Sequence, residues 1–246
     1  MIKFFRQIRY NLMNQNKTTK YFKYAIGEII LVVIGILIAL QINTWNNERI
    51  SNRIVKQSLN RMKTDINKDI EDFEYNIKFY NSLEKRHDSI YNKLVNLKKG
   101  ETMSFRPWIL HVSGVISSNN QTYQEMINTG NFYSVDNKDL VNAISIYYNF
   151  ADTFNARTTF ANQKVDTSRD ILQLQPFWTL SNRLEIIDNI DINWLYDPNS
   201  TVFIALINFL KDSKNANLYK ARIYSIGLEQ AKALLISIDH TLKNYD

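Results

Sequence analysis

Histidine is the residue type best suited to proton transfer or metal binding near neutral pH, and this chain has three of them, His87, His111 and His240. No two are four residues apart and no His-Glu-x-x-His motif is present, so their spacing does not predict a zinc site. His87 lies on the apolar stripe of a predicted helix. At that position a hydrogen-bonded core or interface histidine is expected rather than a ligand.

A small group of acidic and amide residues gathers around Trp194, and it consists of Asp188, Asp191, Asn193 and Asp197. A calcium loop needs the pattern Asp-x-Asp-x-Asp-Gly closed by a glutamate, which is missing here. The chain also lacks a glycine-rich phosphate loop, a Gly-x-Ser-x-Gly elbow and any cysteine. The sequence therefore predicts no catalytic residue, no metal and no cofactor, and we expect a protein that is not an enzyme.

A second group of polar and aromatic residues surrounds a glycine turn in the middle of the chain. This candidate interaction surface consists of Tyr123, Glu125, Asn128, Gly130, Asn131 and Tyr133. Aromatic and polar side chains displayed at one turn are typical of a recognition surface. The alternative is purely structural, because asparagines cap helices and tyrosine rings pack in a core with their hydroxyls exposed.

Glu28 is the one charged residue inside a long apolar segment. An acid within a membrane span costs up to about 3 kcal/mol at the centre and less near an end. Its carboxylate can reach the headgroups and Lys20 or Lys23, or it can lie at a contact between helices. Glu28 is seven residues from Gly35, and Gly35 forms a small-xxx-small pair with Ala39. Our hypothesis is that Glu28, Gly35 and Ala39 mark a helix–helix contact in the membrane.

The segment around this acid is long and apolar enough to cross a bilayer, which needs about 20 residues of helix. We predict a basic N-terminal tail over residues 1–23, a transmembrane helix over 24–45 and a helical-bundle domain over 46–246. A cleaved signal peptide and a buried core helix are the alternatives. No small-x-small cleavage site follows the segment, and the run 29–40 has no polar face.

The net charge of +6 belongs mostly to this N-terminal part. Residues 1–45 carry six Lys or Arg and one acid, whereas residues 46–246 carry a net charge of +1 with the two signs mixed. No basic cluster indicates a nucleic-acid partner. A short tail with six positive charges is hard to export. We therefore expect a single-pass protein of the bacterial inner membrane, with a cytoplasmic N-terminus and a periplasmic C-terminal domain.

The remainder of the chain predicts an all-α fold, because it has few glycines and prolines and its apolar residues recur at spacings of three and four. Helices are expected over 46–99, 122–129, 137–175, 201–211 and 216–244. The mixed stretch 101–119 predicts a loop, a short helix and another loop. The transmembrane helix should continue into a long stalk helix, and the long helices should form an elongated antiparallel bundle.

Two stretches of the chain resemble a family of single-span membrane proteins of Gram-negative bacteria whose function is unknown. The first is the run from Tyr21 to Ile29 together with Val-Val-Ile-Gly-Ile-Leu-Ile-Ala-Leu-Gln-Ile-Asn at 32–43. The second consists of Thr122–Met126, Gly130, Asn137–Leu140 and Tyr147-Tyr148. The resemblance implies an N-terminal anchor, and it implies no activity, cofactor or catalytic residue.

Together these features predict a membrane-anchored, non-enzymatic envelope scaffold or accessory protein that acts through protein–protein contacts. Besides the lipid bilayer, its expected partner is a second copy of the chain or another membrane protein. The alternative is an extracytoplasmic sensor domain that binds a small ligand and signals through a membrane partner. A pocket lined by Trp108, Trp178 or Trp194 would favour the sensor.

Overall fold

The computed structural model describes residues 6, 10, 18–101, 110–173 and 193–245, and the described chain is helical without any strand. The predicted all-α fold is thus confirmed. The residues form two compact units, Met1–Ile54 and Val55–Asp246, and each is considered by itself. Helix α2 (Thr18–Val95) contributes to both units, since it has neither proline nor a positive-φ residue to end it.

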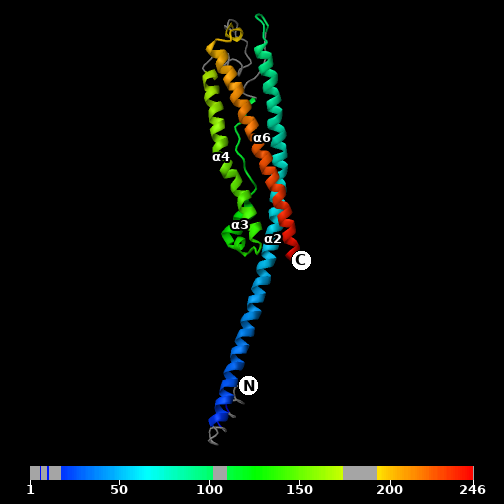
Figure 1. The fold of residues 1–246 in the computed structure, drawn as a ribbon, viewed down its shortest axis with the longest axis vertical. Coiled ribbons are helices and arrows are strands. Elements are labelled where there is room, and N and C mark those ends of the chain that lie inside the picture. Colours follow the sequence, from blue (N-terminus) through cyan, green and yellow to red (C-terminus); the bar gives the residue numbers. More distant parts are fainter. Residues whose placement is uncertain (1–5, 7–9, 11–17, 102–109, 174–192, 246) are drawn as a thin grey trace. The chain divides into compact units, whose positions relative to one another are not determined.

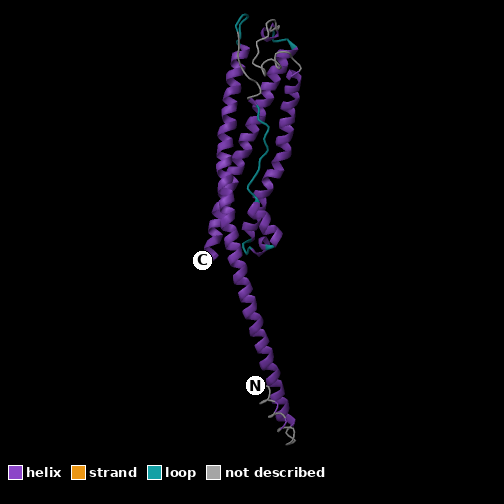
Figure 2. Cartoon of the chain, turned by 180° about the vertical axis from the view of Figure 1, so that it is seen from behind, coloured by secondary structure: helices purple, strands orange, loops and turns teal. Residues whose placement is uncertain are grey.

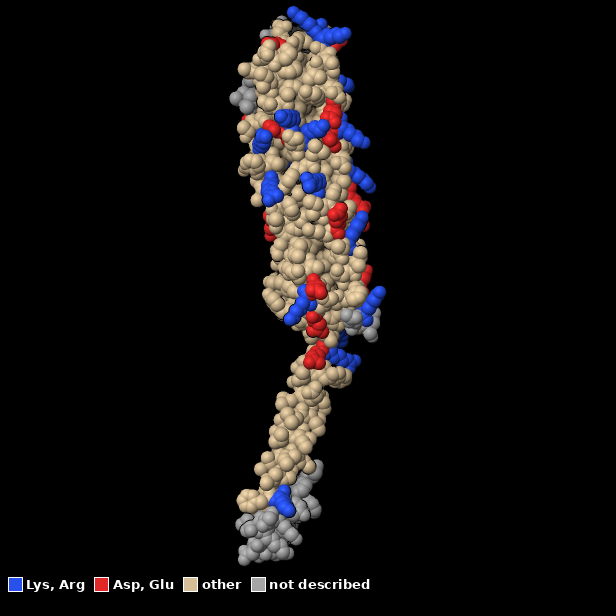
Figure 3. All heavy atoms as spheres, viewed as in Figure 1, with Lys and Arg blue, Asp and Glu red and all other residues tan. Residues whose placement is uncertain are grey.

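The first unit consists of the N-terminal part of α2. Among the described residues this is the one helix long and apolar enough to cross a membrane, and its most apolar 18-residue window has a mean hydropathy of 2.6. None of that window is buried within the chain, and its Ile, Leu and Val side chains are exposed. Figure 3 shows this stretch free of charged side chains on the face in view. A core helix of a soluble domain would instead be covered by its neighbours.

The second unit is a bundle of the C-terminal part of α2 with helices α4 (Lys138–Gln173) and α6 (Thr201–Leu242) (Figure 1). Two ion pairs show the register, with Lys63 near the start of the bundle bound to Asp239 and Glu74 bound to Lys232 at 3.1 Å. These pairs place α6 antiparallel to α2. Helix α4 runs in the same direction as α2, because the chain first returns along the bundle before α4 begins.

The chain returns through an extended segment, residues 110–120, which runs along the bundle between the helices (Figure 2). It leads to two short helices, α3 (Gln121–Thr129) and η2 (Asn131–Ser134), which precede α4. The short helix predicted within 101–119 falls largely on residues outside the described ones. The extended course of residues 111–120 was not predicted.

The core of the bundle follows the apolar stripes of the long helices. The buried apolar residues of α2 lie on one face of the helix, namely Val55, Leu59, Met62, Ile66, Phe73, Tyr80, Leu83 and Leu94. All of these except Leu94 form one cluster with residues of α3, α4 and the C-terminal half of α6. A second cluster joins Leu94 and Leu110 to the end of α4 and the first half of α6. The helical period read from the sequence therefore places the core correctly.

Helix α6 corrects one prediction, because a single helix replaces the two expected over 201–211 and 216–244. The polar residues between the two apolar stretches suggested a loop. In the structure Ser213 and Asn217 are buried, so the polar positions face the interior of the bundle instead of interrupting the helix. No glycine or proline occurs there to break it. Two further 3-10 turns complete the described chain, η3 (Asn193–Tyr196) and η4 (Lys243–Tyr245).

Candidate functional site

The predicted interaction surface lies on α3 and η2, two short helices joined at Gly130. Gly130 has φ 77°, a left-handed conformation that favours glycine, and its N–H donates to the carbonyl oxygen of Ile127 at 3.1 Å. The glycine thus ends α3 and turns the chain directly into η2. Figure 1 shows the two helices side by side at one end of the bundle.

Two carboxylates of α2 fix the start of α3. Asp65 Oδ2 accepts hydrogen bonds from the hydroxyl of Thr122 at 2.5 Å and from its backbone N–H at 3.4 Å. Asp69 Oδ1 accepts from the backbone N–H and the side-chain amide of Asn119, both at 2.7 Å. Acidic groups at a helix N-terminus are also favoured by the helix dipole. The beginning of α3 is therefore held in a defined position against α2.

Asp69 is the most buried acid of this region, with 1% of its surface exposed. Its second oxygen, Oδ2, accepts a hydrogen bond of 2.6 Å from the hydroxyl of Tyr147 on α4. Burial raises the pKa of Asp69, and the hydrogen bonds from Tyr147 and Asn119 counteract that increase. Burial and the neighbouring carboxylate also raise the pKa of Tyr147 above its ordinary value. One buried carboxylate thus ties together α2, α4 and the end of the extended segment.

Aromatic packing fixes the rest of α3 and η2. The ring of Tyr123 stacks on that of Tyr148 with centroids 4.5 Å apart and an angle of 8° between the planes. Phe132 meets Tyr123 edge-on at 5.4 Å. Arrangements of this kind are favourable geometries for aromatic pairs. Tyr123 therefore packs against other aromatic rings, as the purely structural alternative for this residue predicted.

The six residues of the predicted surface are brought together, but they divide into two groups. Tyr123 packs inward, and Asn131 donates from its side-chain amide to the hydroxyl of Thr129 at 2.9 Å. Outside, Glu125 and Asn128 are exposed and Tyr133 keeps 78% of its surface accessible. We call Glu125, Asn128 and Tyr133, together with Arg61, the α3–η2 surface.

Arg61 of α2 belongs to this surface because it pairs with Glu125. Its Nη1 and Nη2 donate to the two carboxylate oxygens at 2.7 and 2.8 Å, the two-point geometry in which guanidinium binds carboxylate best. These hydrogen bonds lower the pKa of Glu125. The pair is exposed, so its main effect is to orient the two side chains and not to stabilise the fold.

A second polar group, not predicted as a group, lies inside the bundle along the extended segment. The carbonyl oxygen of Leu110 accepts from His87 Nε2 at 3.0 Å and from the Asn217 amide at 2.8 Å. Two residues further on, the carbonyl oxygen of Val112 accepts from Lys220 Nζ at 2.7 Å. Helices α2 and α6 therefore supply side-chain donors to a backbone that has no neighbouring strand.

Helix α4 binds the following part of the same backbone. Asn155 accepts from the N–H of Ile116 at 2.9 Å and donates to its carbonyl oxygen at 3.0 Å. Asn162 donates to the carbonyl oxygen of Gly114 at 3.4 Å. The carbonyls of residues 110, 112, 114 and 116 are thus all bound by side chains, in keeping with the two-residue repeat of extended chain.

Burial shifts the pKa of each titratable member of this interior group toward its neutral form. Burial lowers the pKa of His87, and burial with the nearby charges of Lys220 and Arg169 lowers that of His111 to about 3. Burial lowers the pKa of Lys220, which is 1% exposed, to about 8. The ammonium also lies 5.3 Å from the centre of the Tyr80 ring. In the described ranges, no three His, Cys, Asp or Glu residues converge as a metal site would require.

The sequence contains a pattern that indicates this interior polar group. Ser213, Asn217 and Lys220 follow one another at spacings of four and three on α6, so they share a face with the apolar stripe. A polar row on an otherwise apolar face indicates buried hydrogen-bonding groups, although the sequence does not say what they bind.

The other predicted residues lie elsewhere. Glu28, Gly35 and Ala39 are in the first unit, where a Cβ added to Gly35 would meet nothing within 4 Å. Trp194 lies in η3 and packs on the second core cluster. Asp188, Asp191, Trp108 and Trp178 lie outside the described residues. The tryptophan-lined pocket considered for a sensor stays a prediction.

Comparison with known proteins gives one family. Residues 28–191, two thirds of the chain, match the Family of unknown function (DUF6090). No curated protein and no solved structure matches the chain. The match covers both the apolar segment from Glu28 onward and the block from Thr122 to Tyr148, so the predicted resemblance to a family of unknown function is confirmed. Its distribution among Gram-negative bacteria stays a prediction.

Proposed function

The chain belongs to the DUF6090 family of unknown function, which assigns it no activity, and we propose that it is a membrane-anchored bundle that acts through protein–protein contacts. The observation that carries the proposal is the α3–η2 surface. It displays Tyr133 of η2, with 78% of its surface exposed, and the oriented Arg61–Glu125 pair at α3. Tyrosine and arginine are enriched among the residues that dominate binding energy at protein interfaces.

Rigidity of the surface supports this function. The start of α3 is held by Asp65 and Asp69, its middle by the stack of Tyr123 on Tyr148, and its end by the turn at Gly130. A surface that is already ordered loses little conformational freedom on binding, which favours affinity. A loop kept only for connection would not need so many fixed contacts.

A non-enzymatic role is part of the proposal. The interior polar residues His87, Asn217 and Lys220 donate to the chain's own backbone. Each therefore has a structural task that accounts for its presence. The proposed partner is a second copy of the chain or another membrane protein of the envelope, acting as scaffold or accessory subunit.

The proposed location is the inner membrane, with the N-terminus in the cytoplasm and the second unit in the periplasm. It is supported by the exposed apolar helix and by the basic tail that precedes it. A reporter fused after Asp246 that is active only outside the cytoplasm should be active, and the chain should keep its full mass. An inactive reporter would instead place the second unit, and the search for its partner, inside the cell.

Photo-crosslinking in living cells tests whether the α3–η2 surface binds a partner. A photoreactive phenylalanine derivative replaces Tyr133 in the full chain, and the control carries it at Tyr91, an exposed tyrosine of α2 outside the surface. We expect a discrete protein adduct from position 133 only, and its loss when Asn128→Arg is added. The adduct mass distinguishes a second copy from another protein. Equal adducts from both positions, or none from 133, would reject the surface.

A further inference from the structure

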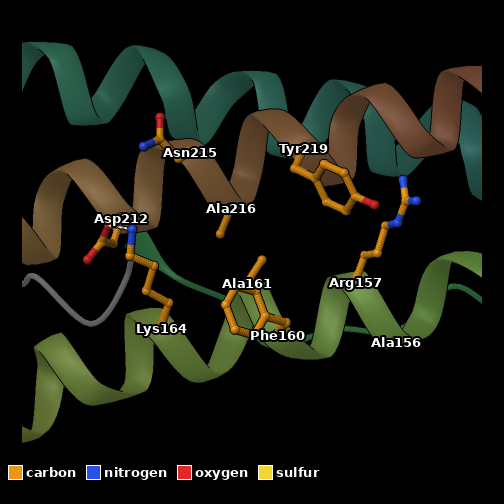
Figure 4. A pocket seen from close by; sticks show the side chains of 9 residues that line it. All are labelled: Ala156, Arg157, Phe160, Ala161, Lys164, Asp212, Asn215, Ala216 and Tyr219. Atoms are coloured by element: carbon orange, nitrogen blue, oxygen red, sulfur yellow. Dashed lines mark ion pairs between the residues drawn. The ribbon is translucent and has the colours of Figure 1, made fainter.

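A groove between α4 and α6, distant in sequence from the α3–η2 surface, is shaped for a small ligand. It has a volume of about 540 Å³, within the range of small-molecule sites. Small residues line the groove between the two helices, namely Ala156 and Ala161 of α4 and Ala216 of α6. Figure 4 shows Phe160 reaching into the same space.

Phe160 indicates that the groove is apolar and uncovered. Its ring is 69% exposed, although the core of the bundle lies directly beneath α4. An aromatic ring left in water is unfavourable, and covering it with apolar ligand surface yields about 25 cal/mol per Å². The middle of the groove therefore selects an apolar body.

The two ends of the groove differ in charge. At one end Lys164 pairs with Asp212 at 3.2 Å, and the other carboxylate oxygen of Asp212 accepts from Ser168 at 2.8 Å (Figure 4). The positive charge there is already neutralised. At the other end Arg157 is exposed and makes no ion pair or hydrogen bond with any described residue.

Tyr219 adds a polar group to the Arg157 end. Figure 4 shows its hydroxyl pointing toward Arg157, and within the described part of the chain this buried hydroxyl has no hydrogen-bond partner. An unpaired buried hydroxyl is costly, and a planar carboxylate can accept from both a guanidinium and a phenol. The end with Arg157 therefore lacks an anion, whereas the end with Lys164 does not.

We propose that the α4–α6 groove binds an apolar monocarboxylate, with its carboxylate on Arg157 and Tyr219 and its apolar body across Phe160 and Ala216. The charge of the groove decides the class: a cationic or neutral ligand would leave Arg157 unpaired, and a dianion would meet Asp212 at the far end. This binding is independent of docking at the α3–η2 surface, so either can fail without the other.

Calorimetric titration of the full chain in lipid nanodiscs tests this assignment, with empty nanodiscs as the blank for partitioning into lipid. The probe is 4-phenylbutanoate, and its matched control is 4-phenylbutan-1-ol, which has the same apolar body without the charge. We expect the acid to bind about tenfold or more tightly than the alcohol, because a charge-assisted pair contributes that much.

Variants assign the preference to the groove. Arg157→Gln should remove the preference for the acid, and Tyr219→Phe should reduce it less. Arg86→Gln, which removes an exposed charge from α2 outside the groove, should leave it unchanged. Equal binding of acid and alcohol, no binding of either, or equal losses in Arg157→Gln and Arg86→Gln would each overturn the proposal.

Discussion

Single residues in the interior of the bundle act mainly as hydrogen-bond donors to backbone. A buried carbonyl without a partner costs about 1–3 kcal/mol, so the extended segment can lie inside the bundle only if its carbonyls are bound. His87, Asn217 and Lys220 meet that requirement for Leu110 and Val112. The position of His87 on an apolar stripe predicted a hydrogen-bonded histidine, and the structure confirms it.

Lys220 makes the stability of the bundle depend on pH. Burial lowers its pKa from 10.5 to about 8 in the folded chain, so the folded state binds fewer protons than the unfolded state between these values. Stability should therefore increase as the pH rises from 8 toward 10.5, by up to about 1.4 kcal/mol per pH unit. Above pH 10 the tyrosines oppose this trend, since burial raises the pKa of Tyr80 to about 12.

Urea unfolding of the full chain in micelles, followed by circular dichroism at pH 7.5 to 10, should show that increase. The Lys220→Met variant keeps an unbranched side chain of similar size and lacks the titrating group, so its stability should change less with pH than that of the native chain over the same interval. If the two chains respond to pH identically, Lys220 keeps an ordinary pKa in the folded state.

The helices could largely be predicted from the sequence, because local periodicity and capping residues determine them. Asn137 caps α4, with its side-chain oxygen accepting from the N–H of Leu140 at 3.1 Å, and Gly130 ends α3. The extended segment and the continuous α6 could not be predicted. Both depend on partners far away in the chain, such as Asn217, which binds a carbonyl 107 residues earlier.

In the candidate site, too, the local features could be predicted and those that depend on distant residues could not. The sequence indicated which residues gather at the Gly130 turn, because they are local. It did not distinguish Tyr123, which packs on Tyr148, from Tyr133, which is exposed, since that depends on how α3 lies on α2 and α4. Arg61 was missed as a member of the surface for the same reason, as it is 64 residues from Glu125.

Close packing between helices is tested at Gly227 of α6. A Cβ at this position would lie 3.0 Å from ring carbons of both Phe73 on α2 and Phe150 on α4, tighter than normal packing allows. Gly227→Ala should destabilise the bundle by about 1–3 kcal/mol, even though alanine is the better helix former by about 1 kcal/mol. Urea unfolding measures the change.

The double variant Gly227→Ala/Phe150→Leu gives the control for this contact. It removes one of the two rings that the new methyl group would meet, so its loss of stability should be smaller than the sum of the two single losses. A Gly227→Ala chain as stable as the native one would mean that the three helices adjust more freely than their packing indicates.

At the scale of the whole molecule, the two units place different demands on their surfaces. The second unit buries its apolar stripes within one chain, so a partner is not needed to complete its core. The first unit exposes its apolar side chains on all sides and depends on lipid or on another helix to cover them. Substitutions in the first unit therefore need not disturb the bundle.

Gly35→Leu separates these two demands. A side chain at Gly35 would meet nothing within 4 Å in the single chain, so the substitution should leave the fold of the bundle unchanged. If Glu28, Gly35 and Ala39 mark a helix–helix contact, the larger side chain should keep the backbones apart and weaken association by about tenfold or more. Gly27→Leu is the matched control, since Gly27 has equal space and, in an α-helix, points about 80° away from Gly35. Fluorescence energy transfer between labelled chains in vesicles measures the effect, and equal transfer in the two variants would assign Glu28 to the headgroups instead.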